Sequence, residues 1–207
     1  MNWMNFAISL VAAYLIGSIP FSYIFGKLQG LDLREHGSGN VGATNALRVL
    51  GTKVGVITLL LDMGKGVLAI ELGRMLLSSG AEWQLVIVAI TAILGHIFTI
   101  FLGFKGGKGV ATSGGVFLDL FPLPCFLALL LFIIIVSITR YVSLGSILAA
   151  GFLFTYMLIA SIREHFVNYP SLAVVTLVAG FIILRHSSNI QRLIKGTENK
   201  ISFNKKK

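Results

Sequence analysis

The chain consists largely of long apolar runs separated by short polar segments. A helix needs about 20 apolar residues to cross the hydrocarbon core of a bilayer, with a range of about 17–25. Runs of this kind predict membrane-spanning helices at about 4–25, 54–77, 84–102, 123–139, 145–161 and 171–184. Pro20 predicts a kink near the inner end of the first run. The pattern therefore predicts an all-α, polytopic membrane helix bundle.

A further apolar segment, which starts near Lys108 and ends at Pro122 and Pro124, is too short for an easy assignment. It is either a short span or a re-entrant helix. If it crosses, the bundle has about seven transmembrane helices, with the N-terminus outside and the C-terminus in the cytoplasm. Almost all lysines and arginines then fall on one side, and Arg163 alone clearly falls on the other. Lysine and arginine concentrate on the cytoplasmic side of membrane proteins, so their placement favours this topology over six spans.

Composition supports the membrane assignment. The chain has 207 residues, of which 56% are hydrophobic and 12% charged, whereas about a quarter of the residues of a soluble domain are charged. A net charge of +9 would suggest nucleic acid in a soluble protein, but here it fits the cytoplasmic loops, and we expect no nucleic-acid partner. The single cysteine, Cys125, excludes an intramolecular disulfide. With no linker visible, we expect one domain over residues 1–207.

The first polar segment, "GSGNVGATNALR", runs from Gly37 to Arg48. It contains a G-x-G-x-x-G pattern, but the preceding segment is a membrane helix rather than the strand that a dinucleotide site requires. Glycine turns can instead present main-chain N–H groups as a concave anion site, usually called a nest. Ser38, Asn40 and Asn45 add neutral donors, and the planar fork of Arg48 suits phosphate. The segment thus indicates an anion site.

Two more polar segments are predicted on the same side of the membrane. The loop "GFKGGKGVATSGG" carries Lys105 and Lys108. Alone it could be a flexible connector, but two such loops on one face favour an anion site. In "RHSSNIQRLIKG", His186 and Asn189 are three residues apart and share a helix face. The alternative for this segment is an interfacial anchor that uses its arginines. We expect the three segments to converge into one basic pocket at the bilayer surface.

Ionisable residues inside the predicted spans are costly and are usually paired or functional. Asp62 and Lys65 are spaced to pair, and the pair is interpreted as structural support beneath the cytoplasmic site, with a direct substrate role as the alternative. Glu71 and Arg74 repeat the spacing near the outer end. His96 either fills a helix contact or lines a pocket, and both readings stay open.

Taken together, these motifs resemble the PlsY-type family of bacterial membrane acyltransferases. The resemblance rests on "GSGNVGATN" with Arg48, "LLLDMGKG", "LGHIF", "GFKGGKGVAT", "RYVSLGSI" and "RHSSNIQRLIKGTE", in this order along the whole chain. It implies a seven-helix bundle in the bacterial inner membrane with its active site facing the cytoplasm. It further implies transfer of an acyl group from acyl phosphate to glycerol 3-phosphate, which gives lysophosphatidate and phosphate in phospholipid synthesis, without a metal or another cofactor.

The resemblance also assigns roles to residues. It implies that Ser38, Arg48 and Lys108 bind phosphate, that Ser143 is a further pocket group, that His186 and Asn189 meet the glycerol end of the acceptor, and that Asn40, Asn45, Gly107 and Thr112 shape the loops.

The chemistry leaves two alternatives open. Either His186 is the general base, since histidine titrates near neutral pH, or a substrate phosphate takes the proton and His186 orients the hydroxyl. We favour the second, because nearby cations lower the basicity of a histidine. A transporter of a phosphorylated solute is the rival function, but it should show related halves and broken helices near mid-membrane. Here the polar residues gather at one face.

Overall fold

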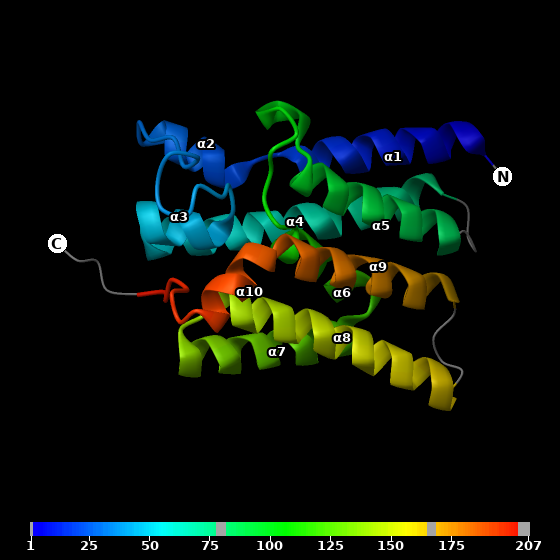
Figure 1. Cartoon of the computed structure of the whole chain (residues 1–207). Coiled ribbons are helices and arrows are strands. Elements are labelled where there is room, and N and C mark those ends of the chain that lie inside the picture. The colour runs from blue at the N-terminus through cyan, green and yellow to red at the C-terminus, as the bar shows by residue number, and fades with distance from the viewer. Residues whose placement is uncertain (1, 78–81, 165–168, 203–207) are drawn as a thin grey trace. The chain divides into compact units, whose positions relative to one another are not determined.

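The structure is a computed structural model that describes residues 2–77, 82–164 and 169–202. The chain divides into two compact units. Unit one comprises the described residues up to Asp119, and unit two runs from Leu120 to Ser202. Within the described residues every regular element is a helix (Figure 1), as the sequence predicts.

Unit one contains the first six α-helices and a short 3₁₀ helix. They are α1 (Trp3–Ser18), α2 (Phe21–Leu28), α3 (Ala43–Leu50), α4 (Thr52–Leu76), α5 (Glu82–Ile97), η1 (Ile100–Leu102) and α6 (Val110–Leu120), whose last residue already belongs to unit two. Helices α1, α4 and α5 lie side by side (Figure 1). Gly17 and Gly95 let α1 and α5 approach closely, because a Cβ atom on either would overlap the main chain of the other helix.

The predicted kink at Pro20 is confirmed. Helix α1 ends at Ser18, α2 begins at Phe21, and Pro20 lies between them. A break of this kind leaves main-chain carbonyl groups without their helical partners, and these must be satisfied inside the protein. The Ser18 carbonyl accepts a hydrogen bond from Thr99 Oγ1 at 2.6 Å. The Ile19 carbonyl accepts one from Lys65 Nζ at 2.8 Å. The break is therefore held by side chains of other segments.

Both predicted ion pairs of α4 are present. Lys65 Nζ lies 2.7 Å from Asp62 Oδ1, and both side chains are buried. Arg74 pairs with Glu71 near the other end of the helix, and its second nitrogen lies 2.5 Å from Asp119 Oδ1 on α6. Pairing is what makes four ionisable residues tolerable on one apolar helix.

Helix α6 is the short element that the sequence left open. Its 11 residues extend about 16 Å at 1.5 Å per residue, against a hydrocarbon core of about 30 Å. It lies directly against α4, since a Cβ atom on Gly115 would overlap the Met63 carbonyl, and one on Gly66 would overlap that of Thr112. Helix α6 alone is shorter than the hydrocarbon core, so a crossing at this place requires flanking residues or local thinning of the bilayer.

Helix α3 was not predicted, because residues 43–50 were interpreted as part of a loop. Its apolar positions Ala46 and Leu50 pack with Leu33 into a small buried core. Residues four apart share a helix face, so the short pattern was present but hidden among the glycines and polar residues of the motif. As a result, Asn45 and Arg48 lie on a helix rather than in a turn.

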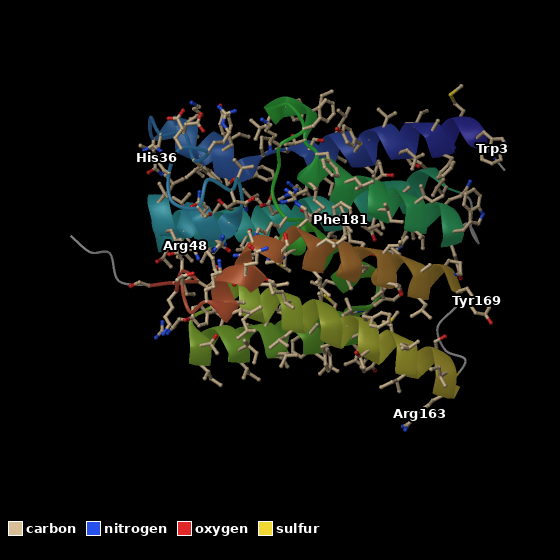
Figure 2. The ribbon with its side chains drawn as sticks, viewed as in Figure 1. Trp3, His36, Arg48, Arg163, Tyr169 and Phe181 are labelled. Atoms are coloured by element: carbon tan, nitrogen blue, oxygen red, sulfur yellow. The ribbon has the colours of Figure 1, made fainter. Side chains whose placement is uncertain are left out.

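Unit two contains α7 (Pro122–Thr139), α8 (Val142–Glu164), α9 (Tyr169–Arg185) and α10 (Ser187–Ile194). Helix α8 lies between α7 and α9 (Figure 1). Arg140, with φ of +64°, ends α7. Helices α9 and α10 are bent by 55° about His186. Arg163 and Tyr169 lie at the end of this unit opposite α10 (Figure 2).

The described residues include four stretches that are long and apolar enough to cross a membrane, and a fifth if α9 and α10 form one bent span. The four are Trp3–Leu28, Glu82–Leu102, Pro122–Thr139 and Val142–Arg163. Helix α4 has 25 residues, more than any single helix among them. Its ionisable residues keep it out of this apolar group. The fold is thus that of a multi-pass membrane protein, while seven crossings and the sidedness of the termini stay predictions.

Candidate active site

Asn45 holds the first glycine-rich loop in place. Its side chain is 1% exposed. The Oδ1 atom accepts a hydrogen bond from the Ser38 main-chain nitrogen at 2.9 Å. Its Nδ2 group donates to the carbonyl oxygens of Leu33 at 3.1 Å and His36 at 3.0 Å. One buried amide therefore fixes the path of residues 33–38 against α3.

Asp32 fixes the beginning of the same loop. Its carboxylate pairs with Lys27 at 3.0 Å and with Arg34 at 2.7 Å, and the Arg34 guanidinium holds its pKa well below the usual range. His36 Nδ1 donates to the Asp32 carbonyl oxygen at 2.8 Å. Sequence analysis did not single out Asp32, although an acidic residue among several cations was a usable signal.

The glycines of this loop take the backbone conformation that was expected of them. Gly37 and Gly39 have φ of +64° and +69°, which glycine adopts without steric cost. The prediction that main-chain N–H groups of this loop bind an anion, however, is wrong for two of these groups. The Ser38 N–H is bonded to Asn45, and the Gly39 N–H donates to the His36 carbonyl at 3.1 Å. These amides stabilise the loop itself.

In the second loop, too, main-chain N–H groups of glycines are bonded within the protein. The Gly106 N–H donates to the Ile97 carbonyl at 2.9 Å, and the Gly107 N–H donates to the His96 carbonyl at 3.2 Å. A Cβ atom on Gly107 would overlap the His96 ring. These glycines therefore permit close packing on the end of α5 instead of presenting amides to an anion. The predicted phosphate ligands that remain are side chains, and Arg48 and Lys108 are the charged ones among them.

Unit one brings the two loops together at a small cavity of about 10 Å³. Val41 of the first loop and Gly106 and Gly107 of the second line it, together with Ser18, Ile19, Pro20, Asp62, Lys65, His96 and Thr99. His96 is thus a pocket-lining residue, one of the two readings of the sequence. Of the predicted site residues in this unit, Ser38 is exposed, Asn40, Arg48 and Lys108 are half-buried, and Thr112 is buried in α6. Arg48 and His36 lie at the end of unit one opposite Trp3 (Figure 2).

In unit two, His186 lies at the bend between α9 and α10 and is 3% exposed. Its Nδ1 atom lies 2.8 Å from the Ile182 carbonyl oxygen. A carbonyl oxygen only accepts, so Nδ1 carries the hydrogen, and in the neutral ring Nε2 is the accepting nitrogen. Asn189 lies on the next turn, inside α10.

Glu198 organises this part of unit two and was missed by sequence analysis. Its Oε1 atom accepts hydrogen bonds from Ser143 Oγ at 2.8 Å and Asn189 Nδ2 at 2.7 Å. Its Oε2 atom lies 2.7 Å from Arg192 Nε. Burial raises the pKa of Glu198, but the hydrogen bonds from Asn189, Ser143 and Arg192 outweigh burial and hold it below the ordinary value. One carboxylate thus joins two of the predicted site residues.

The segment that carries Glu198 is also held in place by a main-chain hydrogen bond. The Ile201 N–H donates to the Arg140 carbonyl oxygen at 2.9 Å, and Lys200 Nζ lies 5.3 Å from the centre of the Tyr141 ring. The segment after α10 therefore packs on the beginning of α8, which places Glu198 beside Ser143.

The fold and these groups define the class as a helical, multi-pass membrane protein with basic, glycine-rich loops. A family model described as glycerol-3-phosphate acyltransferase matches residues 7–196. The chain is 49% identical to the glycerol-3-phosphate acyltransferase of Trichlorobacter lovleyi, over 92% of this chain and 95% of that protein. It is 46% identical to that of Geobacter sulfurreducens, over 95% and 98% of the two chains.

Solved structures agree. A crystal structure of PlsY, an integral membrane glycerol 3-phosphate acyltransferase, in its glycerol 3-phosphate form is 38% identical with a TM-score of 0.87, covering 95% of this chain and 96% of that one. The lysophosphatidic acid form is 36% identical with a TM-score of 0.84, covering 96% of each chain. The chain therefore belongs to the glycerol-3-phosphate acyltransferase family, which confirms the resemblance and decides against the transporter.

Proposed function

We propose that this protein transfers an acyl group from acyl phosphate to the 1-hydroxyl of glycerol 3-phosphate, which gives lysophosphatidate and inorganic phosphate. Acyl transfer to glycerol 3-phosphate follows from the family. The observation that supports a phosphorylated donor is the meeting of two basic, glycine-rich loops at one cavity of unit one. A donor and an acceptor that both carry phosphate need two sets of anion ligands.

Bringing two phosphates together is the main physical problem of this reaction. The repulsion between two charges scales as about 332/(εr) kcal/mol, so it is large at close range in a medium of low dielectric constant. Arg48 offers a planar fork for phosphate oxygens, and Lys108 offers a point charge. Ser38 adds a hydroxyl donor. We assign these three residues to the phosphate groups, with Asn40, Asn45, Gly107 and Thr112 shaping the loops around them.

The chemical step needs no covalent enzyme intermediate, because acyl phosphate is already activated. The acceptor oxygen attacks the carbonyl carbon, the bond from that carbon to the phosphate oxygen breaks, and phosphate leaves. Alignment of the hydroxyl with the carbonyl then supplies much of the rate enhancement. We assign His186 and Asn189 to the glycerol end of the acceptor and Ser143 to the same group of residues.

The hydroxyl proton has two possible acceptors. With Nδ1 donating to Ile182, the Nε2 atom of a neutral His186 is the atom that can accept a hydrogen bond from the hydroxyl. We propose that His186 orients the hydroxyl and that a substrate phosphate takes the proton, because His186 Nδ1 is bonded to a neutral carbonyl oxygen rather than to a carboxylate that would stabilise a charged imidazole. A His186→Gln variant keeps a polar group at this place but no base. Retention of a substantial rate supports this assignment, and a collapsed rate with unchanged acceptor binding supports a histidine base.

We further propose that the chain is a single acyltransferase domain of the bacterial inner membrane, with seven crossings, the N-terminus outside, and the C-terminus and active site at the cytoplasm. The lysine and arginine distribution supports this sidedness. A cluster of rings, in which the ring centre of Phe6 lies 5.4 Å and that of Trp3 6.4 Å from the ring centre of Trp83, supports a membrane interface at the Trp3 end of unit one. Tryptophan concentrates at membrane interfaces, and Trp3 lies at the end of unit one opposite Arg48 (Figure 2).

The test is product formation by the purified full-length protein. Given palmitoyl phosphate and radiolabelled glycerol 3-phosphate, it should form lysophosphatidate together with an equal amount of phosphate. Palmitoyl-CoA and palmitoyl-acyl-carrier protein should not replace the donor. Product from palmitoyl-CoA but not from palmitoyl phosphate would overturn the donor assignment, and absence of any product from folded protein would overturn the function.

A further inference from the structure

Asp62, Lys65 and His96 form a buried polar cluster between α4 and α5. Lys65 Nζ lies 2.7 Å and His96 Nδ1 lies 3.7 Å from the same carboxylate oxygen, Asp62 Oδ1. The three residues are only 2%, 4% and 7% exposed. Ionisable side chains inside an apolar helix bundle are expensive, and their presence points to a role.

The cluster contacts the chain at the break between α1 and α2. Lys65 Nζ donates to the Ile19 carbonyl oxygen at 2.8 Å and lies 5.7 Å from the centre of the Phe21 ring. Ile19 lies in the break between α1 and α2, and α2 leads directly to the loop that carries Ser38. Lys65 therefore holds the main chain at the break from which α2 and then the first glycine-rich loop continue.

The cluster also contacts the second loop. The His96 carbonyl accepts a hydrogen bond from the Gly107 N–H at 3.2 Å, and the His96 ring occupies the place where a Cβ atom on Gly107 would lie. Lys108 is the next residue. A displacement of His96 would therefore move the main chain of Lys108.

The cavity of about 10 Å³ lies among these same residues, and a space of this size holds about one water molecule. The distance of 3.7 Å between His96 Nδ1 and Asp62 Oδ1 is longer than a direct hydrogen bond. The lining includes Val41 of the first loop and Gly107 of the second.

We propose that Asp62, Lys65 and His96 are positioning residues of the acyl transfer, which set the relative place of the two glycine-rich loops from a shared buried cluster. The inference rests on the proposed function, since it assigns the loops to phosphate. A loop that is displaced binds its phosphate group less well, whereas a merely unstable protein contains less active enzyme. The first defect raises KM and the second lowers the apparent kcat.

The test measures KM for palmitoyl phosphate and for glycerol 3-phosphate in His96→Leu and in the double variant Asp62→Leu, Lys65→Met. The double variant is expected to fold, because replacing both partners of a buried ion pair by apolar residues is far better tolerated than removing one. We expect KM for at least one phosphate substrate to rise about tenfold, which corresponds to about 1.4 kcal/mol. Gln84→Leu is the matched control, since Gln84 is a buried polar residue near the other end of α5, and it should leave KM unchanged.

Hydrogen exchange gives a second measurement that needs no substrate. In the wild type the Gly106 and Gly107 amides are bonded to the end of α5 and should exchange slowly, and in His96→Leu they should exchange at least about tenfold faster, while those of α10 do not change. Unchanged KM values together with unchanged exchange at residues 105–109 would overturn the proposal. If wild-type protein makes no product while His96→Leu still accelerates exchange, the proposed function fails and the positioning of the loop stands.

Discussion

Asn189 donates a hydrogen bond of 2.7 Å to Glu198, nine residues later in the chain. The same carboxylate oxygen accepts the Ser143 hydroxyl from α8. A residue expected to meet the acceptor and a residue expected to line the pocket are thus held by one acidic side chain. Because a carboxylate that accepts several hydrogen bonds is favoured in its charged form, this arrangement should depend on pH.

The first prediction concerns acid stability. The pKa of Glu198 lies below its ordinary value of 4.5, so its contribution to stability is present above that value and is lost as the pH falls through the lower folded-state pKa. Thermal unfolding in detergent should show Glu198→Gln to be less stable than wild type at pH 7, with the difference narrowing as the pH falls to about 3. Glu35→Gln, at an exposed position, is the control. A difference that does not vary with pH would contradict this role.

The second prediction concerns the first loop. Asn45→Ala removes one acceptor and two donor contacts from main-chain groups, one contact buried and two partly buried, and an unsatisfied buried group costs about 1–3 kcal/mol. We expect activity to fall at least about hundredfold, since small displacements of binding groups cost this much. Asn5→Ala is matched, because Asn5 also donates to a distant main-chain carbonyl, that of Leu76 at 3.0 Å, but near the other end of unit one. Equal losses in the two variants would show that Asn45 has no special role.

The third prediction tests close packing in the second loop. Gly107→Ala places a methyl group where the His96 ring lies, so the loop must shift, and acyl transfer should fall about tenfold or more. Gly64→Ala is the control, because a Cβ atom there has no neighbour within 4 Å in the described part of the chain and alanine favours the helix. Normal activity in Gly107→Ala would mean that the loop tolerates displacement.

The fourth prediction concerns sidedness. Single cysteines at the exposed positions of Lys53, Arg163 and Lys195, introduced in a Cys125→Ala background, can be labelled with a membrane-impermeant thiol reagent. Cysteines at positions 53 and 195 should react only from the cytoplasmic side, and the one at position 163 only from outside, as the positive-inside rule requires. Reaction of positions 53 and 195 from opposite sides would rule out the proposed topology.

Hydrophobic patterning predicted most of the helices, since a run of apolar residues of membrane length has few alternatives. Proline chemistry predicted the break before Phe21, and spacing along a helix predicted the Asp62–Lys65 pair. Each of these features depends on residues that are close in sequence, which is why local reasoning was sufficient.

The features that were missed depend on contacts between distant segments or on short elements. Helix α3 has only 8 residues, and its core partner Leu33 precedes it by a loop. Glu198 lies in a segment that looks like a solvated tail until Ile201 is seen to bond Arg140. The second loop was interpreted as an anion site partly because it is rich in glycine, while here glycine at positions 106 and 107 is required by the proximity of His96.

The proposed reaction depends on Arg48 and Lys108 as the cations that hold phosphate. The most direct test is the steady-state rate of lysophosphatidate formation by Arg48→Ala and Lys108→Ala, with Arg163→Ala and Lys53→Ala as charge-matched controls. We predict that each site variant is folded but loses at least about a hundredfold in kcat/KM, the scale expected when a group that stabilises developing charge is removed, and that the controls retain wild-type rates. Near-normal turnover by folded Arg48→Ala or Lys108→Ala would contradict the account.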